Sequence, residues 1–193
     1  FGKAQALQGH HFYRWPIIDE VTQLTEKPAT PIDRRAFAAV DLASVTYDQP
    51  TSQLIRQRRS AQRFNPKANL VPLETFQRLL SAMLPSARPP FSSWNWSVKS
   101  HLLVFVHRID NLDPGLYFLV RDLQHLPALQ QALSPEFEWQ QQSMPLAFYR
   151  LRSGDYRQLA KKLSCHQSIA SDSAFSLGML TQFAEPIKDG PWH

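Results

Sequence analysis

Residues 102–120 read LLVFVHRIDNLDPGLYFLV, and this stretch decides the fold. Residues 102–106 form an unbroken apolar run of strand length, which is typical of a strand with both faces covered. Asp113, Pro114 and Gly115 then provide a turn signal. Residues 116–120 return as a second apolar run, so the stretch predicts a β-hairpin.

Three helices are expected before the hairpin. Pro16 suits the first position of a helix whose apolar stripe continues to about residue 26. A short helix is expected over 51–58, with Leu54 and Ile55 turned inward. A stronger helix begins at Pro72 and presents one buried apolar face, formed by Leu73, Phe76, Leu79, Leu80 and Met83.

The chain after residue 84 completes the expected fold. Residues 85–96 (PSARPPFSSWNW) contain three prolines, which exclude regular structure there. Helices are expected over 126–133 and 156–163, and a third strand over about 173–183. An order of helices, hairpin, helices and strand predicts an α+β domain. Its sheet would be mixed or antiparallel and flanked by helices, in contrast to a doubly wound parallel sheet.

The composition narrows the functional classes. Of 193 residues, 43% are hydrophobic and 19% are charged, as in an ordinary soluble globular protein. No apolar run is long enough to span a bilayer and no signal peptide is visible. Together with the single Cys165, these features predict a cytoplasmic protein with no membrane partner. A net charge of +5 suits an anionic cofactor or substrate and does not require nucleic acid.

The stretch RRSAQRF at 58–64 is a candidate phosphate-binding segment. Guanidinium groups of Arg58 and Arg59 can grip phosphate oxygens with forked, charge-assisted hydrogen bonds, and the Ser60 hydroxyl can add a short contact. The alternative is a solvated basic helix end paired with acidic residues elsewhere. Arg56 and Arg63 are interpreted as surface charges. Nucleic-acid binding is disfavoured because no aromatic platform interleaves the cluster.

Cys165 and His166 could suggest a thiolate nucleophile beside its base. Adjacent residues on a helix point in different directions, however, so adjacency in sequence is poor evidence for a catalytic pair. The prediction is a buried thiol beside a hydrogen-bonded histidine. The remaining histidines show no ligand spacing supported by acids or cysteines, so no metal site is expected.

Three segments together resemble the nitroreductase superfamily, in its SagB-type branch. The first is RRSAQRF at 58–64 followed by the helix LETFQRLLSAML at 73–84. The second is the hairpin at 102–120 with its Leu-Asp-Pro-Gly-Leu-Tyr turn, and the third is SCHQSIASDSAFSLGML at 164–180. The resemblance covers about residues 51–183, and the three segments in this order make it fairly specific.

The resemblance implies a nitroreductase-like fold that binds flavin mononucleotide (FMN) and passes hydride through flavin N5. The electron donor would be NAD(P)H, or the substrate itself, a small molecule or a heterocyclic peptide, would be oxidised. The family's counterparts for FMN contact are Arg58, Arg59, Ser60, Gln62, Ser86 and Asn95, with Ser93 as an approximate further match. Phe91, Trp94 and Trp96 could stack on the flavin ring or anchor their loop to the core.

The resemblance also implies a partner. Nitroreductases are usually intimate dimers, and some SagB-like proteins carry two halves in tandem. Residues 10–28 resemble a junction between such halves. We therefore expect residues 1–50 to be an inter-domain junction and connector. Residues 51–193 would be the N-terminal portion of a nitroreductase-like domain, with the fold incomplete and the partner a second half or a homodimer copy.

Two departures from the family pattern support a second hypothesis. Gln62 stands where a basic residue is frequent, and PSARPPFSSWNW replaces the usual flavin loop. The alternative to an FMN-dependent oxidoreductase is a degenerate, non-catalytic lobe that completes a pseudo-dimer and binds a partner.

Overall fold

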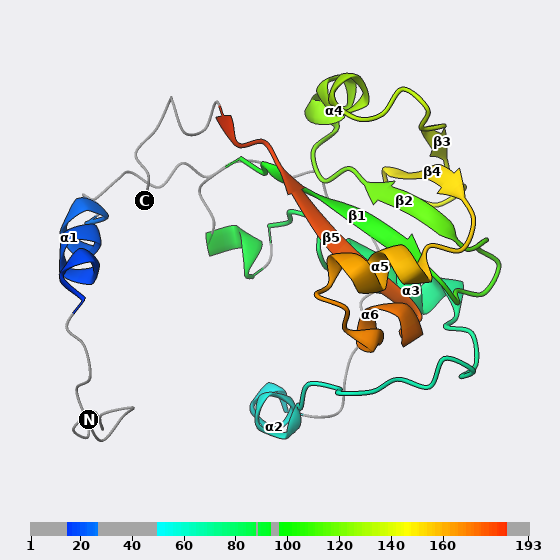
Figure 1. Ribbon diagram of the computed structural model, residues 1–193, viewed down its shortest axis with the longest axis horizontal. Helices are drawn as coiled ribbons and strands as arrows, with labels where there is room; N and C mark the ends of the chain where they lie inside the picture. Colours follow the sequence, from blue (N-terminus) through cyan, green and yellow to red (C-terminus); the bar gives the residue numbers. More distant parts are fainter. Residues whose placement is uncertain (1–14, 27–49, 88, 94–96, 185–193) are drawn as a thin grey trace. The chain divides into compact units, whose positions relative to one another are not determined.

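The computed structural model describes residues 15–26, 50–87, 89–93 and 97–184 (Figure 1). The chain forms two compact units, one of residues 1–33 with 183–193 and one of residues 34–182. The predicted division at residue 50 stays a prediction, because residues 27–49 lie outside the described ranges. The second unit contains the sheet and all described helices except α1.

Helix α1 (Pro16–Leu24) is described by itself. Proline occupies the first turn, where its missing N–H has no helical partner to lose. The predicted helix and its apolar stripe are therefore confirmed. None of its residues is buried among the described residues, and Ile17, Ile18, Val21 and Leu24 remain exposed.

The second unit is built on one antiparallel sheet of five strands (Figure 1). Its spatial order is β3 (Gln140–Gln141), β4 (Phe148–Ser153), β2 (Gly115–Leu119), β1 (Ser100–Val106) and β5 (Phe175–Thr181). Every pairing between these five strands is antiparallel. The predicted hairpin and third strand are confirmed, and the α+β class with them.

The turn of the hairpin depends on close backbone approach. The Tyr117 hydroxyl donates to the Asp113 carbonyl oxygen across 2.8 Å, which closes the Asp113-Pro114-Gly115 turn. A Cβ atom at Gly115 would lie 2.7 Å from the carbonyl oxygen of Arg152 on β4. Only glycine therefore allows β2 and β4 to pair at this point.

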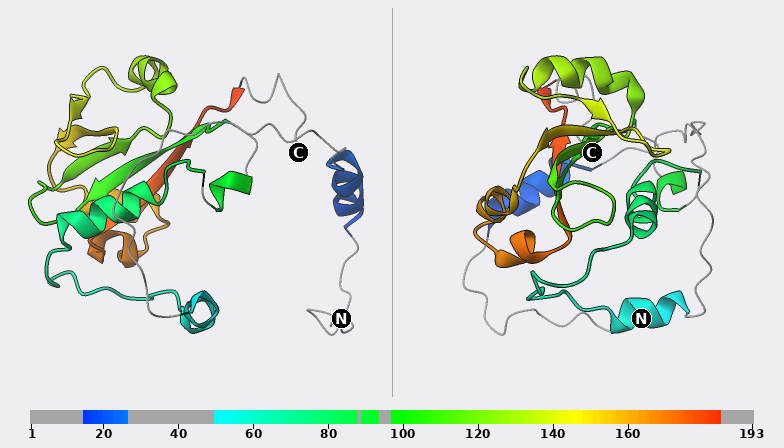
Figure 2. Two further views of the ribbon diagram at one scale, coloured as in Figure 1. Left: turned by 180° about the vertical axis from the view of Figure 1, so that it is seen from behind. Right: turned by 90° about the vertical axis from the view of Figure 1, so that its right-hand side faces the viewer.

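Helices cover both faces of the sheet, so the core has two layers. Helix α3 (Leu73–Ser81) buries Phe76 and Leu80 against one face, where Tyr117 stacks on Phe148 at 5.0 Å between ring centroids. Helices α5 (Arg157–Leu163) and α6 (Ser168–Asp172) lie on the opposite face (Figure 2). Helix α4 (Leu126–Ala132) contributes partly buried leucines to that second layer.

Several elements were not anticipated. The sequence pattern does not predict strand β4, because arginines at 150 and 152 interrupt its apolar residues. The structure nevertheless buries Phe148, Tyr149 and Leu151, so tertiary packing overrides the weak local signal. The expectation of no regular structure over 85–96 needs one correction, because a single 3₁₀ turn, η1 (Phe91–Ser93), forms there.

The predicted helices α2 (Thr51–Gln57) and α3 are confirmed, yet some of their expected inward faces are not. Leu54 and Ile55 are 42% and 69% exposed, so the prediction that they turn inward is wrong for the described structure. Leu79, assigned to the buried face of α3, is 46% exposed. Helix α2 is short and is followed by an exposed segment, so no buried core of the described structure lies against its apolar residues. Helix α3 buries only one stripe of side chains, which leaves Leu79 outside it.

Candidate functional site

The candidate phosphate-binding segment leaves the end of α2 as exposed, extended chain. Arg58 ends the helix with φ −55° and ψ 135°, and every residue over 58–64 is exposed. The Arg59 guanidinium turns back and donates from Nη1 to the carbonyl oxygens of Arg56 and Arg58, at 2.8 and 2.9 Å. Arg59 therefore satisfies helix-end carbonyls through one guanidinium nitrogen, Nη1.

The other polar side chains of the segment are available. Within the described residues, no hydrogen bond or ion pair engages the side chains of Arg58, Ser60 or Gln62. Arg56 donates from Nε to the Ser52 carbonyl oxygen at 3.2 Å, and Arg63 is exposed, in agreement with their interpretation as surface charges. A guanidinium, a hydroxyl and an amide thus lie within five residues of extended chain.

Arg108 fixes the far end of this segment. Its Nη1 donates to the carbonyl oxygens of Asn65 and Ala68, at 2.9 and 3.4 Å. Its Nη2 donates to the Asp172 carbonyl oxygen at the end of α6, at 2.8 Å. Val71 also forms a parallel bridge with Ile109. The segment is therefore attached where β1 ends.

Arg121 attaches the proline-rich loop at the opposite end of β1. Its Nε donates to the Met83 carbonyl oxygen at 2.8 Å, and its Nη1 donates to the Ser100 carbonyl oxygen at 3.1 Å. The Phe91 ring centroid lies 5.5 Å from the guanidinium carbon, a cation–π contact. Burial lowers the pKa of Arg121. These contacts favour the interpretation of Phe91 as an anchor for the loop.

The remaining loop candidates are only partly described. Ser86 is half-buried and already takes part in an interaction. Trp94, Asn95 and Trp96 lie outside the described residues, as does the side chain of Ser93. Because β1 has seven residues, its ends are about 20 Å apart. The structure therefore places the two attachment points of the candidate segments at opposite ends of β1.

A pair of histidines, the buried His101 and the partly buried His125, was missed by sequence reasoning and lies beside Arg121. His101 is 2% exposed, and its Nδ1 accepts from the backbone N–H of Arg121 at 3.1 Å. That bond leaves the ring proton on Nε2, which faces Nδ1 of His125 at 3.2 Å. Burial, followed by the charges of His125 and Arg121, lowers the pKa of His101 to about 4. No sequence spacing signals this contact, because the residues are 24 positions apart.

The prediction of a buried thiol at Cys165 is wrong. Cys165 and His166 are both exposed, with φ of 53° and 61°, in the turn between α5 and α6. The buried histidine of this region is His107, whose Nε2 lies 3.0 Å from the Ala170 carbonyl oxygen. Burial lowers the pKa of His107. Within the described ranges, no group of three potential metal-ligating side chains occurs.

A shallow apolar cavity of about 220 Å³ lies between α5 and the β1–β5 part of the sheet. Leu103 and Phe105 form its floor, Gly178 leaves it open, and Leu163 borders it. No charged residue lines the cavity. It could receive an apolar group, and it offers no acid, base or cation for chemistry.

No protein-family model matches the chain, and no curated protein matches it significantly. The family assignment therefore remains a prediction from the three resembling segments. No helix in the described part of the chain is long and apolar enough to cross a membrane.

Proposed function

We propose that the chain is part of an FMN-dependent oxidoreductase of the nitroreductase type, in the SagB-like branch. The observation that carries the proposal is the exposed segment at 58–62. There Arg58, Ser60 and Gln62 have no hydrogen-bond or ion-pair partner among the described residues. A free guanidinium close to a hydroxyl on extended chain is suited to a phosphate group. The α+β domain with its antiparallel sheet is compatible with the proposed nitroreductase-like fold.

Each candidate residue has a distinct proposed role. Arg58 and Ser60 hold the FMN phosphate and the ribityl oxygens, and Gln62 donates to an edge of the flavin ring. Ser86 and Asn95 contribute from the proline-rich loop. Arg59 uses only Nη1 for its two backbone hydrogen bonds, so its Nε and Nη2 donors can join them. Bound FMN would supply hydride transfer at N5, for which the protein provides binding and orientation.

The length of the extended segment makes a shared site feasible. Ser60 lies five residues before Asn65, and five residues reach at most about 17 Å, a span that the bend at Gln62 shortens. That reach is comparable to the length of β1, which separates the two attachment points. One cofactor could therefore contact the segment through its phosphate and the proline-rich loop through its ring. In the family, a second half or a homodimer partner completes this site.

A non-catalytic lobe is the second candidate function. Gln62 replaces a frequent basic residue, and Phe91 is already engaged by Arg121 in the altered loop. A chain that keeps the fold but has lost flavin contacts would show these features. Such a lobe would bind a partner half through its surface and contain no cofactor.

The visible absorption spectrum of the purified protein tests the proposal. We expect bound FMN, released on denaturation, and its loss in the double variant Arg58→Ala, Ser60→Ala. Arg63→Ala is the matched control, because Arg63 is an exposed arginine of the same segment and is expected to keep the flavin. A colourless protein that takes up no added FMN would overturn the enzyme proposal and favour the lobe.

A further inference from the structure

We propose that Arg108, outside the arginine signature, is the positioning residue that fixes the cofactor segment 58–64 to the domain. Its importance for FMN rests on the proposed function. Its effect on the order of the segment does not depend on FMN.

The hydrogen bonds of Arg108 join three parts of the chain. Nη1 reaches the Asn65 and Ala68 carbonyl oxygens, and Nη2 reaches Asp172. The Asn65 side chain forms its own local turn by accepting from the Lys67 N–H at 3.0 Å. Arg108 therefore holds a preformed turn against the end of α6. Only a planar fork with several donors can serve carbonyls in these two directions at once.

Arg108 is the nearest polar attachment on the C-terminal side of the segment. Among the described residues, the hydrogen bonds of residues 58–64 run back to α2 or within the segment itself. A segment without a fixed end loses conformational entropy when it binds a ligand, and this loss weakens binding. A fixed turn at Asn65 lowers that cost for Arg58, Ser60 and Gln62. Arg108 can thus raise FMN affinity without contacting FMN.

The test compares Arg108→Ala and Arg108→Lys with the control Arg150→Ala. Arg150 is a partly buried arginine that forms ion pairs with Asp113 and Glu138, away from the cofactor segment. Arg108→Lys preserves the charge and the aliphatic stem but not the fork, so it addresses the case in which the alanine variant folds poorly. Amide hydrogen exchange over residues 58–71 measures the order of the segment, and flavin fluorescence measures FMN binding.

We expect faster exchange around residues 65–71 in both Arg108 variants and no change there in Arg150→Ala. The dissociation constant for FMN should rise about tenfold in both Arg108 variants, equivalent to about 1.4 kcal/mol. The Arg150 control should keep wild-type affinity. Failure of lysine to restore affinity would show that the fork, and not the charge, is required.

Two results would overturn the inference. Unchanged exchange over 65–71 in Arg108→Ala as well as in Arg108→Lys would show that Arg108 does not fix the segment. Equal loss of FMN affinity in Arg150→Ala would show that the effect is general destabilisation. If the wild-type protein binds no FMN, the proposed function fails, while the exchange experiment still decides whether Arg108 positions the segment.

Discussion

The imidazole of His101 donates from Nε2 to Nδ1 of His125 across 3.2 Å, and this bond joins the start of β1 to the 3₁₀ turn η2 (Leu123–His125). The other ring nitrogen of His101 accepts the backbone N–H of Arg121. Both nitrogens of the buried ring are therefore used only while the ring is neutral. Protonation would place a second donor against the Arg121 N–H, in a site that already contains a guanidinium.

This arrangement predicts that acid destabilises the fold through His101. Its pKa is about 4 in the folded chain and about 6.5 when unfolded. The folded state thus disfavours protonation of His101. The contribution of neutral His101 to stability is complete above about pH 6.5 and decreases as the pH falls toward 4. The linked loss is roughly 2–3 kcal/mol. Denaturant unfolding between pH 4.5 and 8 measures it.

Replacement of His101 by glutamine should reduce this pH dependence, because no group with a depressed pKa remains at that position, while His107, whose pKa burial also lowers, keeps its own contribution. His166→Gln is the matched control, since His166 is exposed and its loss should leave the slope unchanged. Equal slopes for wild type and His101→Gln would contradict the assignment.

Two glycines in the sheet should differ in their tolerance of a methyl group. At Gly115 an added Cβ would lie 2.7 Å from a backbone oxygen on β4, so Gly115→Ala must shift one strand. We expect a loss of about 1–3 kcal/mol in the free energy of unfolding. At Gly178 the nearest atom to an added Cβ is Leu103 Cβ at 3.6 Å, which is ordinary contact. Gly178→Ala should change stability by less than about 0.5 kcal/mol.

Chemical denaturation of the two alanine variants provides the measurement. The pair is internally controlled, since both changes add one methyl group to a sheet glycine. Similar losses in both variants would show that the contact with β4 does not determine the effect, because the change in backbone entropy from glycine to alanine by itself favours the folded state.

The fold was easier to predict than the site, for a physical reason. Long apolar runs and proline positions are local signals, and they predicted the β1–β2 hairpin and helix α3. Strand β4 depends on pairing with β2, which no local pattern encodes. The contacts of Arg108 and Arg121 join residues 20 to 64 positions apart, so composition and spacing cannot reveal them. The bonds of Arg59 to the Arg56 and Arg58 carbonyls are local, but no residue pattern signals them.

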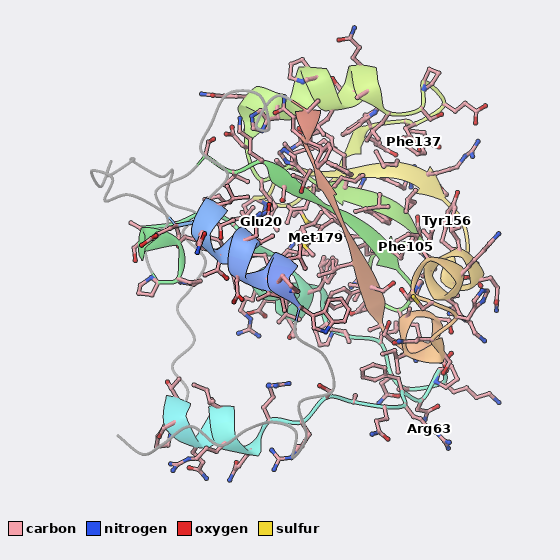
Figure 3. The ribbon with its side chains drawn as sticks, turned by 60° about the vertical axis from the view of Figure 1, so that its left-hand side comes forward. Glu20, Arg63, Phe105, Phe137, Tyr156 and Met179 are labelled. Carbon is pink, nitrogen blue, oxygen red and sulfur yellow. The ribbon has the colours of Figure 1, made fainter. Side chains whose placement is uncertain are left out.

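The outer edge of β5 is an exposed apolar edge in the described sheet. The backbone N–H of His107 donates to the Ala174 carbonyl oxygen, and the backbone N–H of Gln182 donates to the Lys99 carbonyl oxygen. In an antiparallel pair this pattern alternates, so the backbone N–H and C=O groups of the even-numbered residues of β5 point toward β1. The backbone groups of Leu177 and Met179 consequently point outward. Met179 is 78% exposed, and Figure 3 shows its place on the strand. By contrast, β3 at the other edge has only two residues, both glutamines.

We expect Met179→Lys to reduce self-association, because a charge on an edge strand opposes edge-to-edge pairing. Light scattering during concentration would measure the effect at constant ionic strength. Leu123→Lys is the control for added charge, since Leu123 is 60% exposed but lies on η2. If both lysine variants improve solubility equally, net charge is the cause and the β5 edge is not.

The contact between Phe91 and Arg121 predicts which role the aromatic loop plays. If Phe91 anchors the loop, Phe91→Ala and Arg121→Ala should be coupled, with an interaction energy of about 0.5–1 kcal/mol in a double-mutant cycle. Arg121→Ala alone should destabilise more strongly, because it also removes hydrogen bonds to the Met83 and Ser100 carbonyls. Thermal or denaturant unfolding of the four proteins gives the coupling.

A flavin-stacking role would give a different pattern. Phe91→Ala would then lower FMN affinity while leaving the unfolding free energy of the flavin-free protein nearly unchanged, and the cycle with Arg121 would show additivity. The same four proteins, measured with and without FMN, therefore separate an anchor from a stacking platform. The distance of 5.5 Å between the Phe91 ring centroid and the guanidinium carbon favours the anchor, since this contact already ties the loop to Arg121.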